Sequence, residues 1–541
     1  MVFDSTGYRL LIFGGRDGSG NNLNDLWSMS TLIPEWSMLS PAGGPPAARE
    51  RHTAVMDSAH QRMTVFGGSN ASGVLNDSWV LNAPYTPPLG CFYAGMGPNY
   101  LRAQGISEQV GDIVLYCEGG GAPTPQGKPI PEYTVAVTLN TNVTSRFMPQ
   151  ATSLSEALLI VDEAFPAAPI PSYAMSGVMN PPPQILCMPL GSECAETGTG
   201  GTPSPYQTQP NVFVGKQSGT STLYWKVPID PPTEAQGMRR IRLTNLLANA
   251  SQLGMPSGAN SIPIQASVSI KGAEPGPMPP GPLLVGSSLQ GMTADVPSPG
   301  SVPQCETHNA VLLGGSGTAA FDFSVQAMEG FPYAFEIRNY GTYLSGLEYP
   351  PALDAQNVLD YPYYTETGFY YPGLFTSAPT LGLADFGTRI LVSFGSVSAG
   401  TKLFVPTAIT MTGEYGSGNP GGQLQLVQAG PNGNSAPGYE PVASTAMIGT
   451  TPVAEAYSSG TTAYAVYEVI YSLPSVVETA TIPVAVAFTN VPAAGTVNAT
   501  TSLAPLSTVG TANEASSIPR FANFSTAEPA YSITSCAAVK Q

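Results

Sequence analysis

The sequence predicts an all-β protein of several domains. Its 541 residues include 59 glycines and 54 prolines, and Ser, Thr, Ala and Val fill much of the rest. Many turn formers and few helix formers are typical of short strands joined by long connections. Hydrophobic residues make up 42% of the chain, so it can bury real cores, which argues against wholesale disorder.

Two tandem copies of one motif occupy residues 1–85. The first reads FDSTGYRLLIFGGRDGSGNNLNDLWSMSTLIPEW, and the second reads RERHTAVMDSAHQRMTVFGGSNASGVLNDSWVLN. The glycine pairs of the two copies lie 53 residues apart, and their Asn-Asp-x-Trp motifs lie 52 apart. The glycines permit a tight turn with positive φ, and Asn-Asp can hold the loop closed through the local backbone. The residues predicted to carry this structure are Gly14, Gly15, Asp25, Trp27, Trp36, Gly67, Gly68, Asp77 and Trp79.

This layout resembles the kelch repeat, a four-stranded β-propeller blade. Two blades do not close a ring, so the resemblance implies an incomplete propeller at the end of a longer array. We therefore expect further blades and a signal peptide upstream of Met1, and an open blade edge at residues 1–15. Galactose oxidase, a kelch-like propeller, holds copper with Tyr and His ligands beside a Cys. The two copies contain only His52 and His60 and no cysteine, which argues against such a site.

Beyond the two copies, short alternating runs lie between Gly- and Pro-rich turns. Examples are QVGDIVLYCEGG, YTVAVTLNTNVTSRF, AFDFSVQAM and TRILVSFGSV. Such spacing is typical of β-sandwiches. We predict two or more β-sandwich-like domains: one over 86–275, then a Pro/Gly-rich boundary segment over 276–303, and a sandwich-like region over 304–541 with one or two subdomains.

The part from about 88 to 541 also resembles uncharacterised secreted, β-rich proteins of soil bacteria such as the acidobacteria. The resemblance lies in segments that include RAQGISEQVGDIVLYCEGG, RRIRLTNLLANAS, LADFGTRILVSF and PRFANF. It implies export to the cell envelope or beyond, and it implies no particular activity.

The charge balance excludes two classes of partner. The net charge is −17, and the 19 Lys and Arg residues form no basic stripe, which argues against nucleic acid and anionic membrane. Only 10% of the residues are charged, against about 25% in an ordinary soluble domain. No apolar run reaches the roughly 18 residues of a membrane span. These features favour a secreted or cell-envelope protein.

Six cysteines are predicted to form disulfides. Cys187 and Cys194 would close a tight loop, and Cys91–Cys117 and Cys305–Cys536 are natural partners. A zinc site is disfavoured because no CxxC pair occurs and the chain has only three histidines. The alternative of six buried free thiols stays open at this point.

An aromatic stretch, LDYPYYTETGFYYPGLF over 359–375, is the main candidate binding segment. Exposed tyrosines can stack on sugar rings or anchor a protein interface, whereas buried ones only fill space under a long loop. Both interpretations stay open. The candidate residues are Tyr361, Tyr363, Tyr364, Glu366, Tyr370 and Tyr371.

The sequence predicts no cofactor or metal site and does not favour an enzyme. Asp162 and Glu163 are adjacent and would point to opposite faces of a strand, so they cannot work as a pair. Glu336 next to Arg338, and Asp385 near Arg389, suggest ion pairs. Asp17-Gly-Ser-Gly-Asn21 could begin a calcium loop, but a structural turn is favoured because the second copy lacks the first Asp.

We therefore predict an exported, non-catalytic surface or matrix protein that mediates protein or glycan binding. The alternative is an accessory C-terminal region of a secreted carbohydrate-active or oxidase enzyme whose catalytic part lies upstream.

Overall fold

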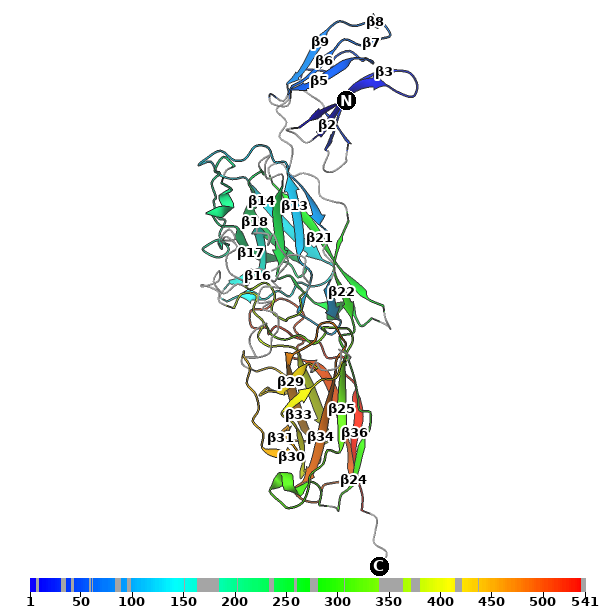
Figure 1. The fold of residues 1–541 in the computed structure, drawn as a ribbon, viewed down its shortest axis with the longest axis vertical. Coiled ribbons are helices and arrows are strands. Elements are labelled where there is room, and N and C mark those ends of the chain that lie inside the picture. The colour runs from blue at the N-terminus through cyan, green and yellow to red at the C-terminus, as the bar shows by residue number, and fades with distance from the viewer. Residues whose placement is uncertain are drawn as a thin grey trace, which may run out of the picture.

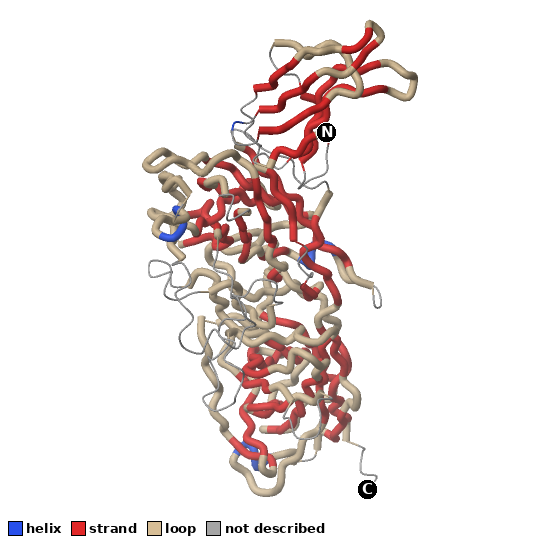
Figure 2. Tube along the Cα trace, turned by 45° about the horizontal axis from the view of Figure 1, so that its top comes forward, coloured by secondary structure: helices blue, strands red, loops and turns tan. Residues whose placement is uncertain are grey.

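The structure, a computed structural model, is all-β as predicted, with 50% of residues in strands and 3% helical (Figures 1 and 2). Among the described residues no helix is long and apolar enough to cross a membrane. The described residues include three short 3-10 turns outside the blades: η3 (Pro205–Gln207), η4 (Ala250–Leu253) and η5 (Ala310–Leu313). The described residues are 1–5, 9–30, 36–39, 43–57, 60, 62–82, 89–94, 99–149, 151–162, 184–201, 203–232, 238–256, 260–272, 281–305, 307–339, 363–370, 380–413, 421–435 and 437–536.

The two N-terminal motif copies form two small antiparallel sheets, here called blade 1 and blade 2, at one end of the molecule in Figure 1. Apolar side chains of both, among them Leu11, Phe13, Met63 and Val65, are buried between them. Blade 1 has the order β1 (Val2–Asp4), β2 (Arg9–Arg16), β3 (Asn22–Ser30), β4 (Trp36–Leu39). Blade 2 has the order β5 (Thr53–Asp57), β6 (Arg62–Phe66), β9 (Ser78–Asn82), with a ribbon of β7 (Ser69–Asn70) and β8 (Gly73–Val74).

Within the expected open blade edge at residues 1–15, the edge strand is β1, which pairs only with β2 among the described residues. β2 lies between β1 and β3, and Leu10 is in register with Phe3 on one side and Met29 on the other. The ladder is therefore paired on both sides of β2. Besides the β1 edge, blade 1 leaves one sheet face open.

One sheet curls around the main core of the central module, residues 89–289. Its order is β10-β13-β19-β16-β17-β18-β14-β21-β22-β11, with β15 on β16, while β12 pairs with β20. Leu115, Val137, Leu159, Trp225 and Val285 from widely separated strands meet in that core. Its strands are β10 (Gly90–Ala94), β11 (Asn99–Arg102), β12 (Glu108–Gln109), β13 (Ile113–Glu118), β14 (Glu132–Leu139), β15 (Phe147–Met148), β16 (Ala151–Val161), β17 (Val212–Ser218), β18 (Thr222–Pro228), β19 (Arg239–Thr244), β20 (Leu247–Ala248), β21 (Ile262–Lys271) and β22 (Leu283–Leu289).

Two facing sheets form the C-terminal module, residues 292–534. Their orders are β23-β25-β34-β27-β31-β30 and β24-β36-β35-β26-β33-β29-β28, with β32 on β33. Val325 and Val484 of the first sheet pack with Val392 and Tyr467 of the second, as in a β-sandwich. The strands are β23 (Met292–Asp295), β24 (Gly300–Pro303), β25 (Phe323–Glu329), β26 (Arg389–Gly395), β27 (Thr401–Pro406), β28 (Ala408–Thr410), β29 (Gln423–Leu426), β30 (Ala446–Ile448), β31 (Thr451–Glu455), β32 (Tyr457–Ser459), β33 (Thr462–Tyr471), β34 (Thr479–Phe488), β35 (Gly495–Ala504) and β36 (Ala527–Thr534).

Between β22 and β23 the chain passes from the sheet of the central module to a sheet of the C-terminal module. β22 pairs with β21 of the central module, whereas β23 pairs with β25 of the C-terminal module. This change lies inside the segment 276–303 that the sequence marks as a boundary. Residues 273–280 are outside the described part, and the exact domain limits stay a prediction.

All six cysteines form the predicted disulfides. Cys91 and Cys117 are direct register partners across β10 and β13. Cys187–Cys194 closes a loop with a sequence separation of 7. Cys305 and Cys536 each lie two residues beyond the paired residues Pro303 and Thr534, and their bridge joins positions 231 residues apart. The alternative of free thiols is thereby set aside.

Glu196 and Glu329 are among the carboxyl groups that the modules bury without a cation. Burial raises the pKa of Glu196 to about 8, and neither of its carboxyl oxygens has a hydrogen-bond partner among the described residues. Burial likewise raises the pKa of Glu329 to about 8, although its oxygens accept hydrogen bonds from the N–H groups of Phe335 and Glu478. Both groups therefore keep their proton in the folded state near neutral pH.

This burial predicts that the free energy of unfolding falls as pH rises from about 5 to about 8. Below the ordinary carboxyl pKa both states hold the proton, but above it the unfolded chain releases the proton first. We expect the melting temperature to fall by on the order of several degrees over this range. Glu196→Gln should flatten the slope because it removes one titrating group. Melting curves at pH 5, 6.5 and 8 check this, and a melting temperature that rises with pH would contradict it.

Candidate binding surfaces

The aromatic stretch lies between the central and C-terminal modules. Tyr363 is 4% exposed. Its hydroxyl donates a hydrogen bond of 2.9 Å to Oδ1 of Asp112 and lies 2.9 Å from the Thr244 hydroxyl. The Arg242 guanidinium binds the other oxygen of Asp112 at 2.6 Å. Tyr363 is thus fixed by central-module side chains, and burial raises its pKa.

Glu366 lies in a buried ion-pair network. It accepts hydrogen bonds of 2.7 and 2.9 Å from the Arg102 guanidinium and one of 2.5 Å from the Thr388 hydroxyl. Arg102, on β11, also pairs with Glu108 of the central module at 2.9 Å. Burial and the neighbouring Glu366 raise the pKa of Glu336 well above its usual range. One guanidinium therefore joins carboxylates of both modules.

A second set of contacts binds the same two modules. Arg146 lies 3.0 Å from Asp385. The Asn245 side chain donates to the carbonyl of Phe369 at 2.9 Å and accepts from its N–H at 2.6 Å. We call the region of these two networks the junction. Loops of both modules meet there in Figure 2.

Two of the candidate binding residues follow the buried interpretation. Tyr363 and Glu366 are buried in the junction and cannot stack on a ligand from solvent. Tyr364 is half-buried, with its ring centroid 5.0 Å from that of Tyr333, and Tyr370 is also half-buried. The remaining candidates, Tyr361 and Tyr371, lie outside the described residues.

The carboxylates weighed for catalysis have structural partners. Asp162 pairs with Arg239, and Asp385 pairs with Arg146 rather than with the expected Arg389. Glu163 lies outside the described residues. The described part of the chain contains no group of three or more side chains that could hold a metal ion. Asp17 accepts hydrogen bonds from the N–H groups of Ser19 and Asn21, as in a structural turn.

A groove of about 240 Å³ is lined by residues of both modules. Gln104 contributes to its wall from the central module, and β23 and β35 contribute from the C-terminal module. Its lining is mixed and includes Asp295, Phe524 and Glu528. No feature of these side chains points to one ligand.

The glycines of the two blades occupy the positions that their turns require. Gly14 has φ +55°, and a Cβ there would lie 2.8 Å from the carbonyl oxygen of Leu23. Gly68 has φ +97°, and a Cβ there would lie 2.6 Å from the carbonyl oxygen of Glu50. A side chain at either place would both strain the backbone and clash.

In each blade, the indole N–H of the Asp-x-Trp motif donates a hydrogen bond to the Asp carboxylate of the same motif. Nε1 of Trp27 donates to Asp25 at 2.6 Å, and Nε1 of Trp79 donates to Asp77 at 2.6 Å. In blade 2 the buried Arg49 adds bonds of 2.5 and 2.8 Å to Asp77 and keeps the pKa of that carboxyl well below its usual range. Sequence reasoning gave Arg49 no role, although it stands in the RERH run that opens the second copy.

A contiguous apolar surface lies on the side of blade 1 that faces away from blade 2. Two rows of side chains cross the sheet in register, one from Phe3 to Trp36 and one from Ile12 to Met38. Phe3 is 50% exposed, Trp36 43% and Met38 60%. We call this surface outer face 1: Phe3, Leu10, Ile12, Trp27, Met29, Trp36 and Met38.

Blade 2 has a corresponding outer face. Val55, Phe66 and Val80 are 61%, 57% and 50% exposed. The side chains that alternate with them, Met63 and Val65, are buried against blade 1. We call this surface outer face 2: Thr53, Val55, Thr64, Phe66, Ser78 and Val80.

A family described as the KLHDC2/KLHL20/DRC7 Kelch-repeats domain matches residues 1–86. Residues 1–86 are a kelch-repeat segment. The chain is similar, over 15% of its length, to part of the flagellar outer arm dynein alpha chain of Chlamydomonas reinhardtii, 38% identical over 87 residues that make up 2% of that protein. It is also similar to part of acyl-CoA-binding domain-containing protein 5 of Arabidopsis thaliana, 33% identical over 76 residues, 14% of this chain and 12% of that one. The chain thus spans only a small part of these curated relatives.

Among solved structures, the chain is similar to the C-terminal domain of the Streptococcus agalactiae AgI/II polypeptide BspA. The identity is 9% and the TM-score 0.23, covering 77% of this chain and 95% of that one. The N-terminal domain of the Streptococcus gordonii adhesin Sgo0707 gives 8% identity and a TM-score of 0.20, with coverage of 97% and 82%. The CupB6 tip adhesin of Pseudomonas aeruginosa is 10% identical with a TM-score of 0.15, and the match covers 83% of this chain and 99% of that one.

The junction network predicts a large stability cost for Arg102→Met. This change leaves Glu108 and Glu366 as buried carboxylates without their cation, which costs about 3–5 kcal/mol. Urea unfolding measures the loss. Lys402→Met is the matched control, because Lys402 pairs with Glu455 at the surface and such pairs contribute about 1 kcal/mol or less. Equal losses in the two variants would contradict the role given to Arg102.

Proposed function

We propose that the chain is an exported, non-catalytic binding protein of the cell surface or matrix, and that its kelch segment contacts other proteins. One observation carries the proposal: outer face 1 presents seven apolar side chains in register, with Phe3, Trp36 and Met38 each 43–60% exposed. Contiguous apolar patches of this kind mark interaction sites on soluble proteins.

Export is supported by the cysteines. All six form disulfides, and disulfides persist in oxidising compartments such as the outside of the cell. The bridge from Cys305 to Cys536 lies just beyond the ends of β24 and β36, which are paired neighbours in one sheet of the C-terminal module. A chain with these three disulfides is suited to an oxidising compartment such as the outside of the cell.

A protein partner fits the blade faces better than a glycan does. Sugar sites combine an aromatic platform with polar groups that hydrogen-bond the hydroxyls, whereas outer face 1 has no polar side chain other than the indole N–H of Trp27, already bound to Asp25. Of the tyrosines considered for sugar stacking, Tyr363 is buried in the junction. As an accessory region of a longer secreted enzyme, the chain would keep this same binding role.

The two modules would serve as a spacer for the kelch segment. Arg102 and Arg146 join the central to the C-terminal module through buried and half-buried ion pairs. In Figure 1 the blades lie at one end of the molecule and the C-terminus at the other. A chain anchored through its C-terminal end would thus present the blades away from the anchor.

Position-specific photocrosslinking on the producing cell tests the proposal. The photoreactive residue p-benzoylphenylalanine replaces Met38 or Val80 in the full chain, and protein adducts are separated and weighed. We expect adducts from both blade positions. Met447 is the matched control, because it is 52% exposed but lies on β30 of the C-terminal module. Absence of protein adducts at Met38 and Val80, or the same adducts at Met447, would overturn the proposal.

A further inference from the structure

We propose that the C-terminal module binds an extended, basic peptide segment of a partner protein, which pairs as an added strand with the free edge of β23. The site is the groove of about 240 Å³ that residues of both modules line. The side chains of this groove point to no single ligand by themselves, but the backbone of β23 does. The groove is separate from the blade faces, so the inference does not depend on the proposed function.

β23 is an edge strand whose outward backbone groups can be identified from its pairing. In an antiparallel sheet, residues directly opposite each other point their N–H and C=O groups either both toward the partner strand or both away from it. Met292 is in register with Glu329 of β25. The Glu329 N–H donates to the carbonyl of Glu478, on the side of β25 away from β23. Met292 and, two residues further on, Ala294 therefore point their own groups away from β25.

Side chains already bind the two ends of this outward row. The carbonyl of Met292 accepts a hydrogen bond of 3.1 Å from the Gln104 side chain. The N–H of Val296 donates to the Glu528 carboxylate at 3.1 Å. Ala294 lies between them, and its N–H and C=O have no hydrogen-bond partner among the described residues. The middle of the edge therefore offers one donor and one acceptor to an added strand.

The groove has the length and the walls to receive a short extended segment. β23 and Val296 form one wall, and β35 with the segment that leads into β36 forms the other. β36 pairs with β35 only up to Thr500, so residues 501–504 have no strand partner on that side in the described part of the chain. Residues 292–296 line the groove, and at about 3.3 Å per residue this length suits a segment of about five residues.

β23 lacks three features that protect many edge strands from pairing. Natural edges often contain Lys, Pro or a β-bulge. β23 reads Met-Thr-Ala-Asp and pairs with β25 without a register shift. Its edge is a regular one, and an extended peptide can add to such an edge through main-chain hydrogen bonds.

The side chains beside the edge determine the alternation of the peptide. Ala294 packs against the core of the module, whereas Asp295 is exposed. Side chains of an added strand alternate in the same way. Those in line with Ala294 point toward the wall of β35, where Ala499 and Leu503 are apolar, and those in line with Asp295 point to solvent. Apolar residues fit the first set of positions.

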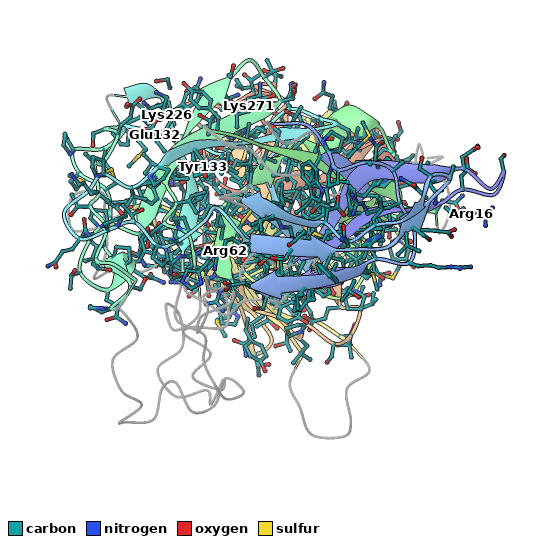
Figure 3. All side chains as sticks on the ribbon, turned by 90° about the horizontal axis from the view of Figure 1, so that it is seen from above. Arg16, Arg62, Glu132, Tyr133, Lys226 and Lys271 are labelled. Carbon is teal, nitrogen blue, oxygen red and sulfur yellow. A yellow bond between two sulfur atoms is a disulfide. The ribbon has the colours of Figure 1, made fainter. Side chains whose placement is uncertain are left out.

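The charge of the groove favours Lys or Arg at the solvent-facing positions. Asp295 and Glu528 are carboxylates in the lining, and no Lys or Arg is among the described residues that form it. By contrast, Glu132 on the central module has Lys226 beside it at 3.9 Å (Figure 3). A basic residue across from Asp295 would supply a cation, and opposite charges across a strand pair stabilise the pairing. The peptide class is therefore one of alternating apolar and basic residues.

Hydrogen–deuterium exchange of the full chain, resolved to single residues by fragmentation, tests the inference. The probe is a capped hexapeptide of alternating Val and Lys, present at about 1 mM. We expect the Ala294 amide to exchange fast in the free chain and more slowly with the probe, because it then donates a hydrogen bond. The same probe with N-methylated valines lacks the N–H groups that would pair with β23, and a probe of alternating Val and Glu has the wrong charge. Neither should slow the exchange.

Variants of the chain test the same contact by fluorescence anisotropy of a labelled probe. Ala294→Pro removes the outward donor, and an edge strand tolerates Pro where its N–H faces outward. We expect about tenfold weaker binding, the upper range for loss of one hydrogen bond. Asp295→Asn should weaken the Val–Lys probe by about two- to fivefold. Met447→Pro is the matched control, because Met447 lies on β30 at the opposite edge of the same sheet, where its N–H also points outward. It should bind the probe like the wild type.

Three results would overturn the inference. One is an Ala294 amide that already exchanges slowly in the free chain, which would mean that the chain itself covers the edge. Another is a wild type that does not bind the Val–Lys probe at about 1 mM. The third is equal binding of the plain and N-methylated probes, which would exclude strand pairing and also decides the matter if Ala294→Pro unfolds the module. Each of these results leaves the proposed function standing, because that proposal is tested at Met38 and Val80 of the blades.

Discussion

The open faces of the kelch segment follow from one constraint: a propeller blade is a sheet with two apolar sides, and each side needs a neighbour. Blade 1 buries Leu11 and Phe13 against blade 2, and blade 2 buries Met63 and Val65 in return. The opposite sides of both sheets are then left with exposed side chains such as Met38 and Val55. The proposed function of the chain depends on that arrangement, since apolar surface in water favours association.

The central and C-terminal modules bury apolar cores of their own. The main cores lie inside the curled sheet of the central module and between the two sheets of the C-terminal module. Their junction is polar, with Arg102 buried between Glu108 and Glu366. Buried charges of this kind are tolerated only as complete sets, because removal of one partner leaves the other uncompensated. The junction between the two modules is therefore buried and paired, whereas the kelch segment leaves apolar sheet faces exposed to solvent.

Local pattern predicted the repeat, the all-β class and the disulfides, since period, strand alternation and cysteine spacing are all properties of short stretches. It could not decide between the two interpretations of the aromatic stretch. The burial of Tyr363 depends on Asp112 and Thr244, more than 100 residues earlier, and no local feature predicts that approach. The role of Arg49 was missed for a similar reason, because its partner Asp77 lies 28 residues away on another strand. The partner of Asp385 was misassigned to the nearer Arg389 because sequence distance was used in place of spatial distance.

The central claim is that the outer faces of the kelch segment are covered when the protein works. Oxidative footprinting measures this directly, by comparing the oxidation rate of Met38 on the producing cell with its rate in dilute purified protein. Met447, of similar exposure in the C-terminal module, is the internal reference. The account predicts that Met38 is oxidised more slowly on the cell while Met447 is unchanged. Equal rates for Met38 in the two settings would contradict it.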